Sequence, residues 1–278
     1  MVLKLCDGAS TDNQIWYSFS VAKPAQIELP TGDTIPIIFE NRSVMAIDKP
    51  AGWMLVPLSW QRTNRNLQAA INSSIAAGDF WARSRGLKFL KYVHRLDADT
   101  TGVMLLAKSM GAVAAYGDMF ENRSVHKTYL AVVAGQPKQR EWVCRSKLGT
   151  DPNRIGSMRV DDREGKDAET TFRVLAQQGG RTLIQAEPLT GRTHQIRVHL
   201  ATSGCPIFGD DLYGSGDSKR LPDLGLRAIR IEFQDPFTRQ RVRVEAPVEH
   251  FLKEFGFPAT AMAGGKAEKK EGGSADAA

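Results

Sequence analysis

The chain has 278 residues, 42% of them apolar and 24% charged, which is enough for one large domain or two small ones. A net charge of +6 and a pI near 9.3 fit a protein that handles polyanions. No apolar run approaches the roughly 18 residues of a membrane span, and we expect no secretory signal. Cys6, Cys144 and Cys205 are isolated, which argues against a disulfide framework or a zinc knuckle and leads us to expect a cytoplasmic protein.

The first third of the chain contains two predicted strands and one predicted helix. Residues 1–32 show no clear period, and we expect an N-terminal extension there. Residues 35–48 are two apolar runs around the turn residues 40–42, which predicts a pair of strands. Residues 67–77 have apolar positions at helical spacing before Gly78, so the sequence predicts a helix that ends at this glycine.

The middle of the chain places an acid beside a predicted strand. Asp97 stands in a short polar turn before residues 103–107, an apolar run that predicts a buried strand. Rigid support is what a catalytic carboxylate needs, because small misplacements of a reacting group cost large factors in rate. Asp99 is expected to form the turn itself. Ser109 is a predicted N-cap for a helix that runs toward Glu121.

The second half of the chain is rich in predicted strands. Residues 124–135 favour a strand, and residues 170–189 predict a hairpin around Gly179-Gly180. A second hairpin is predicted over residues 226–246. A basic stretch with one interleaved aromatic residue lies between residues 135 and 170; its members are Lys138, Arg140, Trp142, Arg145, Lys147, Arg154, Arg159 and Arg163. This stretch fits either a surface that follows a phosphate backbone or a solvated strand face.

The last elements are two short predicted helices and a tail. Thr193 is a predicted N-cap and Gly204 a predicted stop for the first helix, and residues 249–255 predict the second. Residues 258–278 have almost nothing apolar to bury, so we expect a disordered tail.

Three motifs carry a resemblance to a known family. HRLDADTTG at residues 94–102, HKTYLA at 126–131 and TGRTHQIRVH at 190–199 resemble, in the same order, motifs of the RluA-type pseudouridine synthases. The segment KPAG at residues 49–52 adds a shorter match. Thr101 stands where the family usually has Ser, a change that keeps the hydroxyl. The likeness spans about residues 34–254.

The resemblance implies a fold, a reaction and a partner. It implies a mixed α/β (α+β) catalytic domain over residues 33–257, with a bent, largely antiparallel central sheet flanked by helices. The implied reaction isomerises uridine to pseudouridine in structured RNA, either ribosomal or transfer RNA. The substrate base must leave its stack to be reached. A monomer without metal or cofactor is expected.

The resemblance also implies roles for five residues of this chain. Asp97 would be the catalytic acid, and Arg197 would pair with it, since an Arg stays charged and offers two donors to a carboxylate. Tyr129 would stack on the target uracil. Arg95 would replace the displaced base or hold its phosphate, and Ile196 would line the pocket.

Three other functions compete for the same residues. A glycosidase also cleaves a glycosidic bond, but it needs two acids across that bond. A zinc hydrolase would use His194 and His199, whose spacing of five misses the i, i+4 face of a helix. A non-catalytic RNA-binding protein would have no use for an ionised acid beside an anionic ligand, which disfavours it given Asp97.

Overall fold

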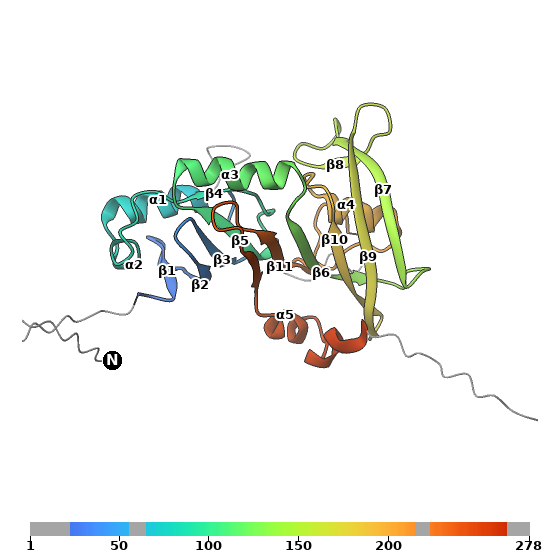
Figure 1. Cartoon of the computed structure of the whole chain (residues 1–278). Helices are drawn as coiled ribbons and strands as arrows, with labels where there is room; N and C mark the ends of the chain where they lie inside the picture. The colour runs from blue at the N-terminus through green and yellow to red at the C-terminus, as the bar shows by residue number, and fades with distance from the viewer. Residues whose placement is uncertain (1–22, 56–64, 215–222, 266–278) are drawn as a thin grey trace, which may run out of the picture.

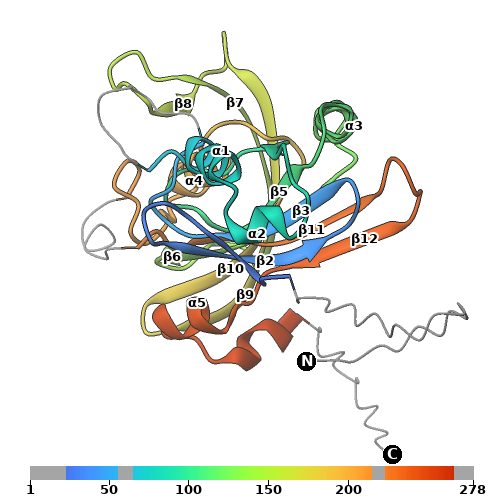
Figure 2. The same cartoon turned by 90° about the vertical axis from the view of Figure 1, so that its left-hand side faces the viewer.

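The structure is a computed structural model that describes residues 23–55, 65–214 and 223–265. These residues form one mostly antiparallel sheet in the strand order β1-β2-β3-β5-β11-β6-β10-β9-β7-β8, with β12 paired to β11 and β4 paired to β5 (Figures 1 and 2). The predicted mixed α/β class is confirmed. No helix within the described ranges is long and apolar enough to cross a membrane.

Short helices interrupt the series of strands along the chain. The strands are β1 Gln26–Glu28, β2 Thr34–Glu40, β3 Val44–Lys49, β4 Lys91–Tyr92, β5 Thr101–Ala107, β6 His126–Ala134, β7 Glu141–Thr150, β8 Met158–Val160, β9 Lys166–Gln178, β10 Arg181–Pro188, β11 Leu226–Gln234 and β12 Arg241–Glu245. The helices are α1 Leu67–Ala77, α2 Phe80–Arg83, α3 Met110–Glu121, α4 Gln195–Thr202, α5 Glu249–Glu254 and the 3-10 helix η2 Ala259–Gly265.

Local chemistry explains where the two longest helices begin and end. The Asn66 side chain accepts a hydrogen bond from the backbone N–H of Ala69, and Gly78 ends α1 in the left-handed conformation with φ of 72°. The Ser109 hydroxyl accepts from the Ala112 N–H at the start of α3. The predicted bounds of both helices are therefore confirmed.

Strand β5 separates two layers of the core. Its side chains alternate, so that Met104 and Leu106 join the apolar cluster under α1 and α2, whereas Val103 and Leu105 join the cluster under α3. A third cluster packs β6, β9 and β10 against α4. The start of β5 is thus held from both faces, which fixes the turn that precedes it.

The sheet narrows to a short parallel seam between β5 and β11. Their pairing is limited to Thr101 with Arg227 and Gly102 with Ala228. Gly102 has φ of 110°, and a Cβ atom added to it would lie 2.0 Å from the carbonyl oxygen of Ala228. Glycine is required here because no other residue allows this backbone approach. The seam therefore fixes how the two halves of the sheet meet.

The structure differs from the sequence expectation at both ends of the ordered body. Within the expected extension, Gln26–Glu28 pairs with β2, because Ile27 is buried in the core. Within the expected tail, Ala259–Gly265 forms η2, and Ala261 packs into the cluster that holds α5. The remainder of the two expected segments, residues 1–22 and 266–278, lies outside the described residues.

The aromatic residue of the basic stretch, Trp142 on β7, packs toward the core. The Trp142 ring stacks on Phe172, with the ring centroids 5.0 Å apart, and packs against the cluster below α4. Arg145 forms an exposed ion pair with Glu169. Trp142 is therefore partly buried, and one face of its ring is covered by Phe172.

Candidate active site

A cavity of about 350 Å³ opens across the seam between the two halves of the sheet. This volume is within the range of small-ligand pockets. The five residues singled out in the sequence all line it: Arg95, Asp97, Tyr129, Ile196 and Arg197. The structure thus brings together side chains from the turn before β5, from β6 and from α4.

The turn that carries Asp97 is held by a buried lysine. Lys49, at the end of β3, has no exposed surface, and its ammonium group donates to the carbonyl oxygens of Pro50, Ala98 and Thr100 at 2.9, 2.6 and 3.1 Å. Burial lowers the pKa of Lys49 to about 8, although the charges of Asp99 and Asp97 oppose that shift. One side chain therefore ties the turn to the neighbouring strand.

The same turn is held from its other side by an imidazole. The backbone N–H of Leu105 donates to Nε2 of His94 at 3.0 Å, and the His94 ring stacks on Phe120. An accepting Nε2 carries no proton, which agrees with a pKa of His94 that burial lowers to about 3. His94 is therefore a neutral ring that supports the backbone.

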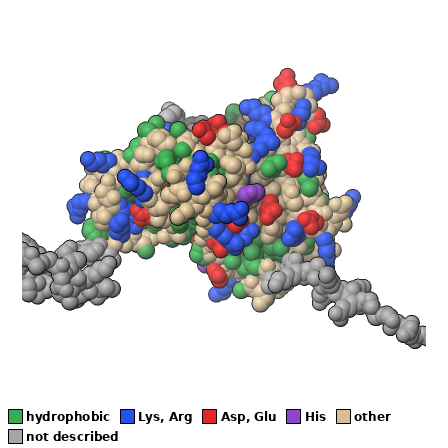
Figure 3. Space-filling view, viewed as in Figure 1, with side chains coloured by type: hydrophobic (Ala, Val, Ile, Leu, Met, Phe, Trp, Pro, Cys, Tyr) green, Lys and Arg blue, Asp and Glu red, His purple; other side chains and the backbone are tan. Residues whose placement is uncertain are grey.

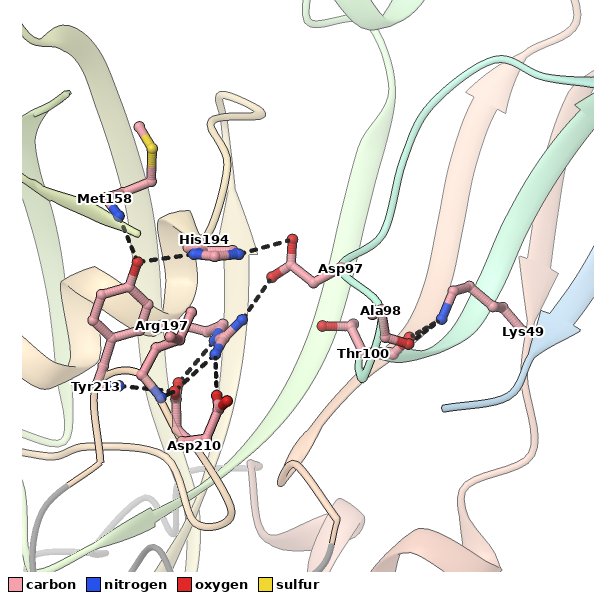
Figure 4. A network of polar contacts seen from close by, with 11 residues as sticks. Lys49, Asp97, Ala98, Thr100, Met158, His194, Arg197, Asp210 and Tyr213 are labelled. Atoms are coloured by element: carbon pink, nitrogen blue, oxygen red, sulfur yellow. Dashed lines mark hydrogen bonds and ion pairs between the residues drawn. The ribbon is translucent and has the colours of Figure 1, made fainter. Parts of the chain in front are cut away.

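Arg197 faces three carboxylates, Asp97, Asp210 and the exposed Asp211, and Asp210 is the closest of them. Its Nε and Nη2 atoms donate to the two oxygens of Asp210, each at 2.8 Å, while its Nη1 lies 3.5 Å from Oδ2 of Asp97 (Figure 4). Burial alone would lower the pKa of Arg197, but the hydrogen bonds and charge of Asp210 and the charge of Asp97 raise it. Asp210 thus orients a permanently charged guanidinium toward Asp97.

His194 approaches the other oxygen of Asp97. Its Nε2 lies 3.9 Å from Oδ1, and its Nδ1 lies 2.8 Å from the Tyr213 hydroxyl (Figure 4). That hydroxyl accepts the backbone N–H of Met158 at 2.7 Å, so its own proton is free to go to Nδ1. When the hydroxyl donates to Nδ1, the Nε2 atom carries the ring proton and points it at Asp97. Burial lowers the pKa of His194 although the charge of Asp97 opposes this, so the ring is neutral.

The remaining lining residues differ in exposure. Tyr129 is partly buried between two core clusters, and burial together with the charge of Asp97 raises the pKa of its phenol. Ile196 is buried, whereas Arg95 is exposed. Thr100 is buried, and its hydroxyl has no hydrogen-bond partner among the described residues.

Helix α4 begins one residue later than expected. Its N-cap position is His194 rather than Thr193, and His194 adopts a left-handed conformation with φ of 54°. His194 makes no side-chain capping hydrogen bond. The segment before the helix is held instead by the Gln195 side chain, whose Oε1 accepts from the Arg192 N–H at 3.0 Å and from the Thr190 hydroxyl at 2.6 Å. The strained backbone turns the His194 ring toward Asp97.

The alternative sites have different geometry. His194 contacts Tyr213, while His199 is buried with Nδ1 3.0 Å from the Thr170 hydroxyl, so the two rings serve separate contacts. Of the acids in the described part of the chain, Asp97 and Glu121 line the cavity. Asp99 is exposed and is not part of the lining.

Comparison with known proteins decides the family. Residues 43–202 match the sequence pattern of the RNA pseudouridylate synthases. The chain belongs to this family. Its enzymes are isomerases that convert uridine to pseudouridine in RNA, and this chain is one of them.

Relatives of the enzyme extend the match beyond that segment. An uncharacterized RNA pseudouridine synthase, YhcT of Bacillus subtilis (strain 168), is 34% identical over 227 residues, which are 81% of this chain and 72% of the relative. Ribosomal large subunit pseudouridine synthase C of Haemophilus ducreyi is 39% identical over 173 residues, 60% of this chain and 54% of the relative. The enzyme of that name from Escherichia coli (strain K12) is 33% identical over 226 residues, with shares of 78% and 67%.

Solved structures share the fold. Human RNA Pseudouridylate Synthase Domain Containing 1 has a TM-score of 0.62 at 23% identity, over 79% of this chain and 86% of the human one. Human RNA Pseudouridylate Synthase Domain Containing 4 has a TM-score of 0.62 at 21% identity, over 79% and 92%. At these identities the likeness concerns the fold alone.

Sequence reasoning missed four residues of this enzyme's candidate site: Lys49, His194, Asp210 and Tyr213. Lys49 belongs to the KPAG segment, and His194 lies inside the TGRTHQIRVH motif, so both stood in motifs without an assigned contact. Asp210 and Tyr213 lie beyond residue 202, where the family match ends. The segment GDDLYG at residues 209–214 contains these acidic and aromatic residues, but the sequence alone does not show which side chains they contact.

Proposed function

We propose that the protein isomerises specific uridines in structured RNA and that Asp97 is its catalytic carboxylate. The observation that carries the proposal is the position of Asp97 on the cavity wall, 17% exposed, with the Arg197 guanidinium near one oxygen and the His194 ring near the other. A carboxylate held between two such groups and facing a pocket can act on a substrate as nucleophile or base.

The reaction requires three events inside the cavity. The uridine leaves its stack and enters the pocket, because the glycosidic bond is not reachable inside a helix. The bond from C1′ to N1 breaks, the uracil turns, and a bond from C1′ to C5 forms, while C5 loses a proton and N1 gains one. Tyr129 offers an aromatic face to the uracil, and Ile196 helps exclude water.

Arg95 has a separate role in the proposal. It is exposed at the rim of the cavity, two residues from Asp97. A guanidinium at this place fills the gap left by the displaced base or binds its phosphate. Substrate binding and the chemistry are thus served by neighbouring residues of one turn.

The proposed substrate is ribosomal RNA of the large subunit, and transfer RNA is the second candidate. Support comes from the names of relatives that are 33% to 39% identical to this chain. One continuous sheet contains the strands of the site, which supports a single catalytic body. We further propose that it acts as a cytoplasmic monomer without metal or cofactor.

The Asp97→Asn variant tests the mechanism. We expect it to fold as the wild type does, because Asn has nearly the same shape, and to form no pseudouridine. The measurement is pseudouridine formation by the purified protein on ribosomal and transfer RNA taken from cells that lack the gene. Clear turnover by this variant would remove Asp97 from the mechanism.

A matched control separates chemistry from local charge. Asp99→Asn makes the same change two residues away, on an exposed side chain outside the cavity lining, and we expect it to keep most activity. Mapping pseudouridine across total RNA from cells with and without the gene identifies the position. If no position differs between the two, the proposed substrate class is wrong.

A further inference from the structure

A second pocket, of about 610 Å³, lies away from the cavity of Asp97. It is lined by residues of β2 and the turn that follows, of the segment after α2 and of the position just after β5. Its charged and polar lining residues are Lys23, Glu40, Asn41, Arg42, Arg85, Lys88 and Lys108. Five cations against one carboxylate give this pocket a formal charge of +4. We call this group of residues the basic pocket.

The floor of the basic pocket is an internal ion network. Glu40 accepts from Arg85 Nε at 2.8 Å and from Lys108 Nζ at 2.6 Å. Arg85 also donates to the carbonyl oxygens of Trp81 and Pro24, and its side chain is 4% exposed. Burial would raise the pKa of Glu40, but hydrogen bonds from Lys108 and Arg85 lower it overall. The floor is therefore rigid and still carries one net positive charge.

The rim of the basic pocket adds three exposed cations. Lys23, Arg42 and Lys88 are exposed and have no ion-pair partner among the described residues. The turn that carries Arg42 is preorganised, because Asn41 accepts the N–H groups of Ser43 and Val44 and donates to Asp235. Figure 3 shows Lys and Arg side chains gathered over the end of the molecule that carries α1 and α2. Fixed, uncompensated cations of this kind suit phosphate groups.

The basic pocket lies at the opposite end of β5 from the proposed catalytic acid. Thr100 lines the catalytic cavity before β5 begins, and Lys108 lines the basic pocket just after β5 ends. Seven strand residues at about 3.3 Å each separate the two places by roughly 20 Å. An RNA stem whose loop enters the cavity can reach that far along its backbone.

We infer that the basic pocket is a second RNA-binding site that holds backbone phosphates remote from the modified uridine. The inference rests on the proposed RNA substrate. The site would contribute affinity and orientation and no chemistry, since phosphate contacts position a nucleic acid without reading its sequence.

The salt dependence of RNA binding tests this inference. Removing one phosphate contact makes the slope of log K against log salt shallower by about 0.7 to 0.9. For the full-length chain with a short RNA hairpin of fixed sequence, we expect this change for Lys88→Gln and about twice this change for Arg42→Gln with Lys88→Gln. Lys253→Gln on α5 also removes one exposed cation and should keep the wild-type slope. Slopes that equal the wild type in the double variant, or that change as much in the control, would overturn the inference.

Two further measurements complete the test: steady-state kinetics and the binding of inorganic phosphate. We expect the double variant to raise KM for RNA and to leave kcat within about twofold, as a loss of uniform binding predicts. A fall in kcat with an unchanged salt slope would assign these residues to stability and sink the inference. Binding of inorganic phosphate alone that the double variant abolishes, without any change in the RNA slope, would mean a free-anion site. If the wild type forms no pseudouridine while the slopes change as expected, the proposed function fails and the RNA site stands.

Discussion

At the scale of single residues, the candidate site depends on two side chains that orient others. Asp210 accepts two N–H groups of the Arg197 guanidinium, and the Tyr213 hydroxyl forms a hydrogen bond with Nδ1 of His194. Neither lines the cavity. Their effect on Asp97 is therefore indirect, through the groups that face its two oxygens.

Tyr213→Phe removes only the hydroxyl from this series of hydrogen bonds. His194 then has no donor at Nδ1, and the Met158 N–H has no acceptor. A hydrogen bond worth about 1 to 1.5 kcal/mol corresponds to a fall in kcat of about 5- to 13-fold, with KM for RNA nearly unchanged. Steady-state kinetics measure the split. Tyr92→Phe, at the partly buried position of β4, is the control and should keep the wild-type kcat. Equal losses of kcat in both variants would contradict this role of Tyr213.

Tyr129 allows a pair of variants that separate stacking from the phenol group. Tyr129→Phe keeps the aromatic face, and we expect it to retain most base binding. Tyr129→Ala loses stacking worth about 1–3 kcal/mol, or about 5- to 150-fold in kcat/KM. The same pseudouridine assay serves both variants. Equal activity in the two would argue against a stacking role.

At the scale of elements, Lys49 joins β3 to the turn before β5. Lys49→Met keeps the length of the side chain and leaves three carbonyl oxygens without their donor. Each buried unsatisfied group costs about 1–3 kcal/mol, so we expect the free energy of unfolding to fall by at least about 2 kcal/mol. Urea denaturation measures it. Lys91→Met, at the exposed position of β4, should stay within about 0.5 kcal/mol of the wild type, and a similar loss there would contradict the assignment.

Elements with local signals were predictable from the sequence, and elements that depend on distant partners were not. The caps Asn66 and Ser109 contact residues three positions away, so the bounds of α1 and α3 follow from short stretches. The start of α4 was predicted one residue too early, because its first turn is held by Gln195 and by the contact of His194 with Tyr213. Trp142 sits in a basic stretch, and only the pairing of β7 with β9 reveals that it packs on Phe172.

The candidate site shows the same division. The motifs HRLDADTTG and TGRTHQIRVH led to Asp97 and Arg197, which the structure places in one cavity. Asp210 was not predicted, because its link to Arg197 depends on a loop that returns after α4. Lys49 was not predicted as a support, since its three acceptors are backbone atoms, which leave no mark in the sequence.

At the scale of the whole molecule, two imidazoles inside the fold make stability depend on pH. Burial lowers the pKa of His94 to about 3 and that of His199 to about 4. The unfolded chain takes up these protons near pH 6.5, whereas the folded protein does not, so the free energy of unfolding falls as pH drops from about 6.5 toward 4. Each ring contributes up to about 1.4 kcal/mol per pH unit within that window.

Urea denaturation at about pH 7 and at about pH 5 measures this loss. The His94→Gln variant can still accept the Leu105 N–H and does not titrate in this range, so we expect a smaller difference between the two pH values. His250→Gln replaces an exposed ring and should show the wild-type difference. A His94→Gln protein as sensitive to acid as the wild type would contradict the assignment.

The narrow seam at Gly102 also bears on biosynthesis. Asp97 and Lys49 belong to the half of the sheet that is made first on the ribosome, whereas Tyr129, Arg197 and Asp210 arrive later. A nascent chain that has completed only β1 to β5 holds the acid without its guanidinium and without an aromatic wall. On the proposed mechanism such a fragment is inert, so activity requires the pairing of β5 with β11 that brings the two halves together.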